Sequence, residues 1–141
     1  KIKKRDKKKN FILLVKSLES FEKYLEEINT EDKTFLNKHW PGPYTFLIKY
    51  NEKLPTHLKN TSGKIAIRVS NHLPIRNLFE SFSGFIVSTS ANISGEKNIN
   101  DPNQIINYFE YEEMAYYDEI LGNNKSPSTI IDLESRAIIR E

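Results

Sequence analysis

The sequence predicts an α/β fold with a mixed parallel and antiparallel sheet and flanking helices. Short apolar runs typical of strands alternate along the chain with segments whose apolar residues recur at helical spacing. The last two apolar runs, 128–133 and 136–140, are separated by Glu134 and Ser135, a spacing typical of an antiparallel hairpin. A chain of 141 residues is long enough to bury one core. We therefore expect residues 1–141 to form a single domain.

The first part of the chain predicts one strand and two helices. Residues 11–15 form a continuous apolar run, which is typical of a buried strand. Residues 17–28 are expected to form an amphipathic helix, because apolar residues recur there at helical spacing. A second helix is expected to begin at Thr30, with Phe35, Leu36 and Trp40 on its apolar side. It ends at Pro41-Gly42-Pro43, because proline disfavours a helical residue before it.

The middle of the chain predicts two strands and a third helix. The strands cover residues 44–48 and 64–69, where apolar and β-branched residues dominate. The polar stretch 53–63 between them is a loop, with a single helical turn at 56–58. The third helix begins at Pro74, since the first helical position does not need a backbone N–H.

The last part predicts a strand, a helix and the closing hairpin. Residues 84–87 form a short buried strand that ends in the small hydroxyl residues of 88–95. A helix is expected to start at residues 101–104, which combine a cap, a proline and a glutamine three residues after the cap. Residues 111–119 are expected to contain another short strand before the hairpin.

The composition excludes several classes of protein. The chain has no cysteine and only three histidines, without metal-ligand spacing, so a zinc or disulfide framework is not expected. No apolar run is long enough to span a membrane and no signal peptide opens the chain, so we expect a cytoplasmic protein. The net charge of +2 hides a strongly basic segment, residues 1–9. The sequence begins at Lys1 inside this segment, so we expect it to be a fragment that lacks an upstream part.

Polar and charged groups lie at the ends of several predicted strands. Residues 88–95 offer hydroxyls, an amide and closely spaced backbone N–H groups, which suit a nest for phosphate or carboxylate oxygens; the alternative is a polar surface loop. Arg68 lies within an apolar run, where a guanidinium must either meet an acid or receive an anionic ligand. These features favour a polyanion such as a nucleotide, although the P-loop motif is absent.

Six short motifs in order make the chain resemble a known family. They are Lys3-Lys4-Arg5, Trp40 to Thr45, Ala66 to His72, Ser88 to Gly95, Pro127 to Asp132, and Ile138-Ile139-Arg140. With these motifs the chain resembles the YrdC-like family of threonylcarbamoyl-AMP synthases over nearly its whole length. The resemblance implies a YrdC-like sheet with a concave basic cleft. Family members also carry a segment before the first motif, and we expect that segment to be absent here.

The resemblance implies an ATP-dependent transfer. L-threonine and bicarbonate form a carbamate, which attacks the α-phosphate of ATP to give threonylcarbamoyl-AMP and pyrophosphate. The implied ATP-binding residues are Lys3, Arg5, Lys9, Ser90, Asn92 and Arg140. The implied threonine- and carbamate-binding residues are Arg68, Ser88, Thr89 and Ser128. No catalytic acid or base and no protein metal ligand is assigned, and Mg²⁺ is expected to accompany the triphosphate.

The resemblance also implies partners in RNA modification. The product serves a downstream tRNA threonylcarbamoyl transferase, and tRNA or double-stranded RNA could bind the basic cleft. A non-catalytic module that binds double-stranded RNA or nucleotide is the main alternative, and it predicts a steep dependence on salt. A family member that binds nucleotide without turnover is a second alternative. A serine acyl enzyme is disfavoured because Ser90, Ser94 and Lys97 lack the order and the partner motif that such enzymes need.

Overall fold

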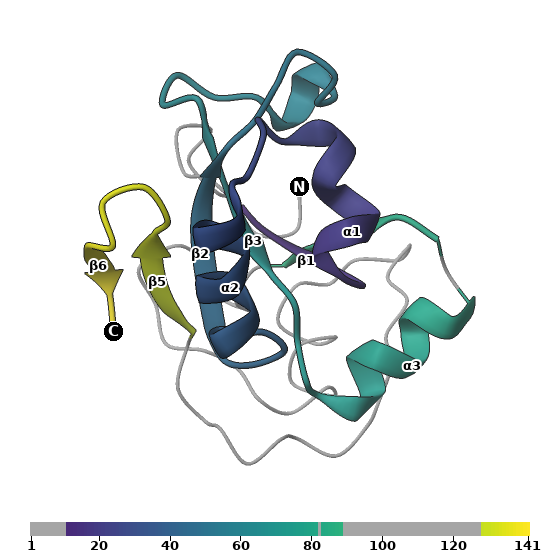
Figure 1. Ribbon diagram of the computed structural model, residues 1–141. Helices are drawn as coiled ribbons and strands as arrows, with labels where there is room; N and C mark the ends of the chain where they lie inside the picture. The colour runs from purple at the N-terminus through teal and green to yellow at the C-terminus, as the bar shows by residue number, and fades with distance from the viewer. Residues whose placement is uncertain (1–10, 82, 89–127) are drawn as a thin grey trace, which may run out of the picture. The chain divides into compact units, whose positions relative to one another are not determined.

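The computed structural model describes residues 11–81, 83–88 and 128–141, all of which belong to one compact unit of the chain. Its strands form one sheet in the order β4-β1-β3-β2-β5-β6. Figure 1 labels β1, β3, β2, β5 and β6 of this sheet. The strands are β1 (Ile12–Val15), β2 (Tyr44–Lys49), β3 (Lys64–Arg68), β4 (Phe85–Ser88), β5 (Thr129–Asp132) and β6 (Ile138–Arg140). The helices are α1 (Leu18–Phe21), α2 (Thr30–His39) and α3 (Leu73–Ser81), with 3-10 turns η1 (Glu22–Tyr24) and η2 (Thr56–Leu58).

The sheet is mixed, which confirms the predicted fold class. β1 runs parallel to β3 and β2 runs parallel to β5, whereas the pairs β1–β4, β2–β3 and β5–β6 are antiparallel. The predicted closing hairpin is the antiparallel pair β5–β6, with an irregular register between Ile130 and Ile131. The single turn at 56–58 is also confirmed, and α3 begins one residue before Pro74.

The hydrophobic core lies between one face of the sheet and the helices. Phe46 pairs with Ile67 on one side and with Ile131 on the other, and all three side chains are buried. Figure 1 shows α1 and α2 on the same side of the sheet. The centre of the Phe46 ring lies 5.8 Å from that of Phe35 and 5.3 Å from that of Trp40, in edge-on geometry. Phe46 and Trp40 belong to the core, and the partly buried Phe35 packs against it.

The predicted helix over 17–28 is wrong as a continuous element. Its apolar positions are indeed buried, but the helix stops after α1 and η1, and Leu25 is extended. The backbone N–H of Glu26 donates to the carbonyl of Lys49, and Leu25 forms a bridge with Tyr50. The Asn51 side-chain amide also donates to the Leu25 carbonyl at 2.9 Å. Pairing with the end of β2 therefore replaces the helical hydrogen bonds that the apolar spacing had predicted.

The second helix starts and ends as predicted. α2 begins at Thr30 and stops at His39, just before Trp40 and Pro41. Its cap is Asn29, whose Oδ1 accepts from the backbone N–H of Asp32 at 2.8 Å. This bond satisfies one of the N–H groups that a helix start leaves without an internal partner.

Replacing Asn29 with alanine is expected to lower the free energy of unfolding by about 1 kcal/mol, because the N–H of Asp32 loses its capping acceptor. Urea unfolding followed by circular dichroism measures this change. Asn29→Ser keeps a capping oxygen and should retain most of the stability. Equal losses from both variants would contradict a capping role.

Other predictions concern regions that the structure does not describe. The helix start at 101–104 and the strand within 111–119 lie outside the described residues, as do residues 1–9 and the predicted cleft that they would form. Among the residues that the structure describes, no helix is long and apolar enough to cross a membrane.

Candidate functional site

The face of the sheet opposite the core carries the polar residues predicted for the site. Thr45 pairs directly with Arg68 in β3 and with Ile130 in β5, and Ile130 pairs with Arg140 in β6. Directly paired residues point to the same face of a sheet, whereas successive residues alternate between faces. Since Phe46 lies on the core face, its neighbour Thr45 and the two arginines project from the other face. We call this the polar face and define it by Thr45, Arg68 and Arg140.

Arg68 is half-buried on this face and is held by a backbone carbonyl. Its Nε donates to the carbonyl oxygen of Gly42 at 3.2 Å. Within the described residues no carboxylate forms an ion pair with Arg68. Desolvation by burial lowers the pKa of this guanidinium, which nevertheless stays charged at neutral pH. Among the described residues, the Arg68 side chain donates a hydrogen bond to the carbonyl of Gly42, and an anionic ligand stays a prediction for this guanidinium.

Gly42 lies in a tight turn that leaves no room for a side chain. A Cβ added at this position would lie 2.5 Å from the carbonyl oxygen of His39, closer than real Cβ atoms approach. The backbone N–H of Gly42 donates to the carbonyl of Val69 at 2.9 Å. The turn between α2 and β2 is thereby joined to the residue after β3, next to Arg68.

Ser128 joins the polar face through contacts with two neighbouring strands. It lies directly before β5 and is buried, and its Oγ lies 2.6 Å from Oγ1 of Thr45. The carbonyl oxygen of Ser128 accepts from Nη2 of Arg140 at 2.9 Å. The structure therefore brings Ser128, Arg140 and the strand that pairs with Arg68 together at one region of the sheet.

Of the remaining predicted site residues, Ser88 lies within the described ranges. Ser88 ends β4 opposite Ile12, and Ile12 pairs with Ala66, two residues before Arg68. Ser88 thus shares the polar face but lies in a different cross-strand row from Arg68. The other predicted residues lie outside the described ranges: Lys3, Arg5, Lys9, Thr89, Ser90 and Asn92.

The sequence alone assigns no role in the site to Thr45. It is completely buried, and it pairs with Arg68 across β2 and β3 while its hydroxyl contacts the Ser128 hydroxyl. The available signal was its position at the end of the motif from Trp40 to Thr45. Alternation of side chains along a strand places Thr45 and Phe46 on opposite faces of the sheet.

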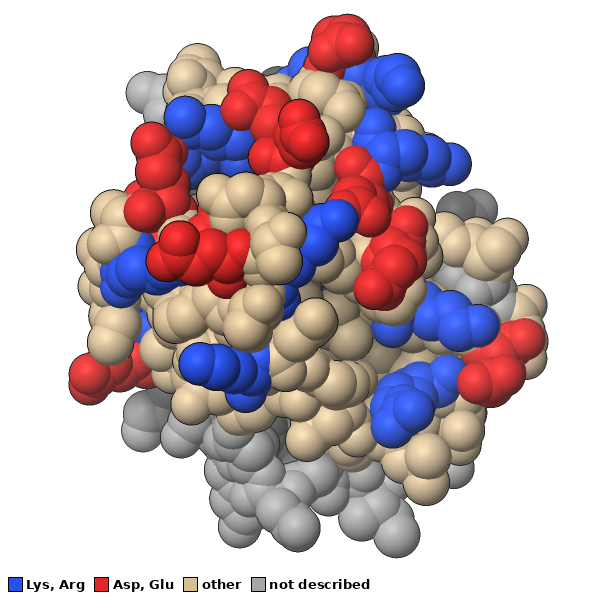
Figure 2. All heavy atoms as spheres, in the orientation of Figure 1, with Lys and Arg blue, Asp and Glu red and all other residues tan. Residues whose placement is uncertain are grey.

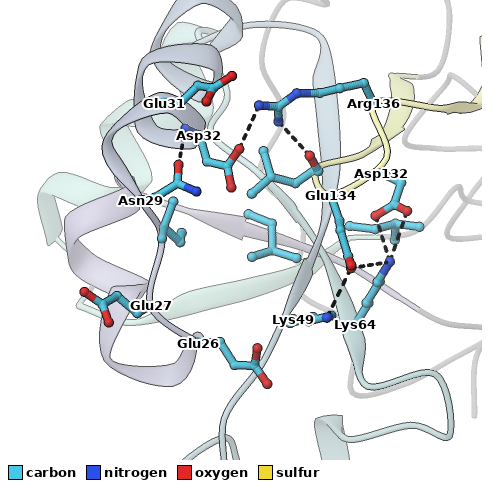
Figure 3. A pocket seen from close by; sticks show the side chains of 14 residues that line it. Glu26, Glu27, Asn29, Glu31, Asp32, Lys49, Lys64, Asp132, Glu134 and Arg136 are labelled. Carbon is cyan, nitrogen blue, oxygen red and sulfur yellow. Dashed lines mark hydrogen bonds and ion pairs between the residues drawn. The ribbon is translucent and has the colours of Figure 1, made fainter.

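A cluster of ion pairs lies beside the β5–β6 hairpin (Figure 3). Nζ of Lys64 contacts both carboxylate oxygens of Asp132 at 3.0 Å, and it also contacts Glu134. Burial alone would raise the pKa of the Asp132 carboxyl. The hydrogen bonds from Lys64 and Ser135 outweigh burial, so the pKa of Asp132 lies below its usual value.

This lowered pKa of Asp132 predicts a specific loss of stability in acid. A carboxyl whose pKa is lower in the folded state contributes stability above its unfolded pKa of about 3.9 and loses it as the pH falls through the folded pKa. The stability difference between the wild type and Asp132→Asn should therefore shrink as the pH falls below about 4. Urea unfolding over this pH range tests the prediction, and a constant difference would contradict it.

The pocket in Figure 3 is a poor candidate for a polyanion. It has a volume of about 530 Å³, and none of the predicted site residues within the described ranges lines it. Its charged lining residues are Glu26, Glu27, Glu31, Asp32, Asp132 and Glu134 together with Lys49, Lys64 and Arg136. The excess of carboxylates would repel phosphates. On the face shown in Figure 2, acidic and basic side chains are interspersed among the described residues. The polar face is therefore the better candidate for an anionic substrate.

The family comparison covers the whole chain. A family model for Sua5, YciO and YrdC proteins, described as "Telomere recombination", matches residues 1–141. A curated relative from Saccharophagus degradans, named threonylcarbamoyl-AMP synthase, is 36% identical over 140 residues, which cover 99% of this chain and 73% of the relative. A relative of the same name from Buchnera aphidicola is 35% identical over 141 residues, covering 99% of this chain and 74% of the relative.

Solved structures show the same fold. A crystal structure of P. abyssi Sua5 complexed with L-threonine matches with a TM-score of 0.79 and 27% identity, over 94% of this chain and 39% of that protein. The chain therefore corresponds to less than half of the P. abyssi protein. The crystal structure of E. coli YciO matches with a TM-score of 0.76 and 25% identity, over 99% of this chain and 69% of that protein.

Proposed function

The chain belongs to the Sua5, YciO and YrdC family, and from this membership we propose that it is an L-threonylcarbamoyladenylate synthase. The observation that carries the proposal is the similarity of nearly the whole chain to relatives named threonylcarbamoyl-AMP synthase. No comparison favours the alternative of a non-catalytic RNA- or nucleotide-binding module. The enzyme would be a nucleotidyltransferase that acts in the modification of tRNA.

The proposed reaction joins three substrates. The amino group of L-threonine and bicarbonate form a carbamate with loss of water. A carbamate oxygen then attacks the α-phosphorus of ATP, and the bond from this phosphorus to pyrophosphate breaks. Such a transfer depends mainly on positioning and on neutralising charge, which fixed guanidinium groups and hydroxyls can supply.

The charged and hydroxyl side chains among the described residues suit the binding of the carboxylate of threonine and the phosphates of ATP. We propose that Arg68 binds the threonine carboxylate, because its guanidinium is half-buried and no described carboxylate neutralises it. Ser128 would help to hold threonine, and Arg140 would contact the nucleotide from the adjacent strand. Lys3, Arg5, Lys9, Ser90 and Asn92 remain proposed ATP ligands, and Ser88 and Thr89 remain proposed threonine and carbamate ligands.

We propose that ATP enters as its Mg²⁺ complex, with the metal held by the triphosphate. Within the described ranges no three His, Cys, Asp or Glu side chains are grouped so that they could bind a metal ion. We also propose that the product passes to a downstream tRNA threonylcarbamoyl transferase in the cytoplasm. Contact with tRNA or double-stranded RNA would involve the basic segment 1–9.

The test is release of pyrophosphate by this chain from ATP, measured with L-threonine and bicarbonate and with each omitted in turn. The proposal expects release only when all three substrates are present, together with threonylcarbamoyl-AMP detected by mass spectrometry. Release that does not require threonine would contradict it. Saturable binding of ATP or threonine without release would indicate a binding protein without turnover. RNA binding without binding of either substrate would favour the alternative module.

A further inference from the structure

The buried hydroxyl pair of Thr45 and Ser128 has a role that the proposed function does not assign. We propose that Thr45 is a positioning residue, whose hydroxyl donates to Oγ of Ser128 and leaves the Ser128 hydrogen to donate to an anionic oxygen of the bound substrate. This inference rests on the proposed function and deepens it. It concerns the direction of a hydrogen bond in the site, and it makes Thr45 necessary for the orientation of Ser128.

The two hydroxyls have two hydrogens to donate between them. Each hydroxyl has one hydrogen to donate and can accept hydrogen bonds as well. The contact of 2.6 Å between Thr45 Oγ1 and Ser128 Oγ uses one of the two hydrogens, and either atom could be the donor. Both residues are buried, with exposed fractions of 0% for Thr45 and 4% for Ser128. Buried donors are almost always satisfied, so the second hydrogen requires an acceptor. No further hydrogen bond of either hydroxyl occurs within the described residues.

The position of each residue decides which hydroxyl keeps the second hydrogen. Thr45 lies in β2, between β3 and β5, where its neighbours are paired strands on both sides. Ser128 lies directly before β5, where the chain enters the sheet, and its carbonyl holds the guanidinium of Arg140. We therefore assign the contact with the ligand to Ser128, which is 4% exposed, and not to Thr45, which is 0% exposed. A donor beside a guanidinium is suited to an anion, because both groups stabilise negative charge.

The expected acceptor is a carboxylate or a phosphate oxygen. Arg68 pairs with Thr45 across β2 and β3, and Arg140 lies on the other side of Ser128 in β6. The carboxylate of threonine and the phosphates of ATP share the chemistry that these donors recognise. Separate titrations of the two substrates distinguish them.

The experiment compares Thr45→Val with Thr45→Ser. Valine keeps the shape of threonine but removes the hydroxyl, whereas serine keeps the hydroxyl. Isothermal titration would measure the dissociation constants of L-threonine and of ATP separately, and thermal unfolding would establish that each variant is folded. For Thr45→Val we expect about 10-fold weaker binding of one substrate, the scale of a hydrogen bond to a charged group, with the other nearly unchanged. Thr45→Ser should bind both substrates within about 2-fold of the wild type.

Ser128→Ala supplies a second, independent test that does not alter the core strand. It should weaken the same substrate as Thr45→Val, and the double variant should lose little more than either single variant, because both remove one interaction. Unchanged binding of both substrates by Ser128→Ala would overturn the inference, as would additive losses in the double variant. Wild-type protein that binds neither substrate would overturn this inference and the proposed function together. Wild-type protein that binds but releases no pyrophosphate would overturn only the proposed turnover.

Discussion

Replacing Arg68 with alanine is expected to weaken the binding of L-threonine by about 2–4 kcal/mol, or roughly 30- to 1,000-fold in the dissociation constant. This range applies to the truncation of one partner in a buried, hydrogen-bonded charge pair. Arg68 fits that description because it is half-buried and because no carboxylate in the described part of the chain neutralises it. Titration of the folded variant with L-threonine measures the effect.

The geometry of Arg68 also predicts that lysine cannot replace it. Nε donates to the carbonyl of Gly42, which leaves the two terminal amino groups of the guanidinium as the donors that we assign to a ligand. These two groups can donate to both oxygens of a carboxylate at the same time. Arg68→Lys keeps the charge but loses this paired contact, so most of the affinity should still be lost. Threonine affinity that is unchanged in Arg68→Ala would refute the role, and equal loss of ATP binding would indicate misfolding.

Much of the sheet was predictable because its strands have strong local signals. The buried runs that became β1 and β3 are continuous and apolar, and the pair β5–β6 has the spacing of a hairpin. The strand order was not predictable, because it depends on contacts between segments far apart in the sequence. The prediction of one helix over 17–28 was wrong because it also depends on a contact between distant segments: Leu25 pairs with Tyr50 instead of continuing the helix.

The candidate site was predictable only in part. A guanidinium inside an apolar strand is unusual enough to single out Arg68 from the sequence alone. The contact between Thr45 and Ser128 joins residues 83 positions apart, and no local pattern indicates it. Gly42 could be recognised as part of a turn, but the sequence does not show that its carbonyl holds Arg68.

The second large effect is a loss of folding stability, which we expect when Arg136 is replaced. The side chain of Arg136 connects the β5–β6 hairpin to α2 (Figure 3). Its Nη2 donates to Oδ1 of Asp32 at 2.7 Å, and its Nη1 donates to the carbonyl of Leu133 at 2.6 Å. The guanidinium also lies 4.0 Å from the centre of the Phe35 ring. Because Ser128 and Arg140 lie at the open end of this hairpin, the contacts of Arg136 help to place both of them.

Arg136→Ala is expected to lower the free energy of unfolding by about 2–4 kcal/mol. Hydrogen bonds to charged groups contribute about 1.5–3 kcal/mol and a cation–π contact about 0.5–1 kcal/mol. Urea unfolding measures the loss. Lys33→Ala on the same helix is the matched control, since Lys33 forms an ion pair with Glu22 of the same 2.7 Å length but in solvent. It should leave the unfolding midpoint nearly unchanged.

Arg136→Gly separates the side chain of this residue from its backbone conformation. Arg136 has a φ of 63°, a left-handed conformation that costs a side-chain-bearing residue energy and that glycine adopts freely. Alanine loses the contacts and keeps this strain, whereas glycine loses the contacts and relieves it. The free energy of unfolding should therefore be higher for Arg136→Gly than for Arg136→Ala by roughly 0.5–1 kcal/mol, after the greater flexibility of glycine in the unfolded chain is counted. If both variants were as stable as the wild type, the contacts with Asp32 and Phe35 would not hold the hairpin, and the placement of Arg140 would have to come from β5 alone.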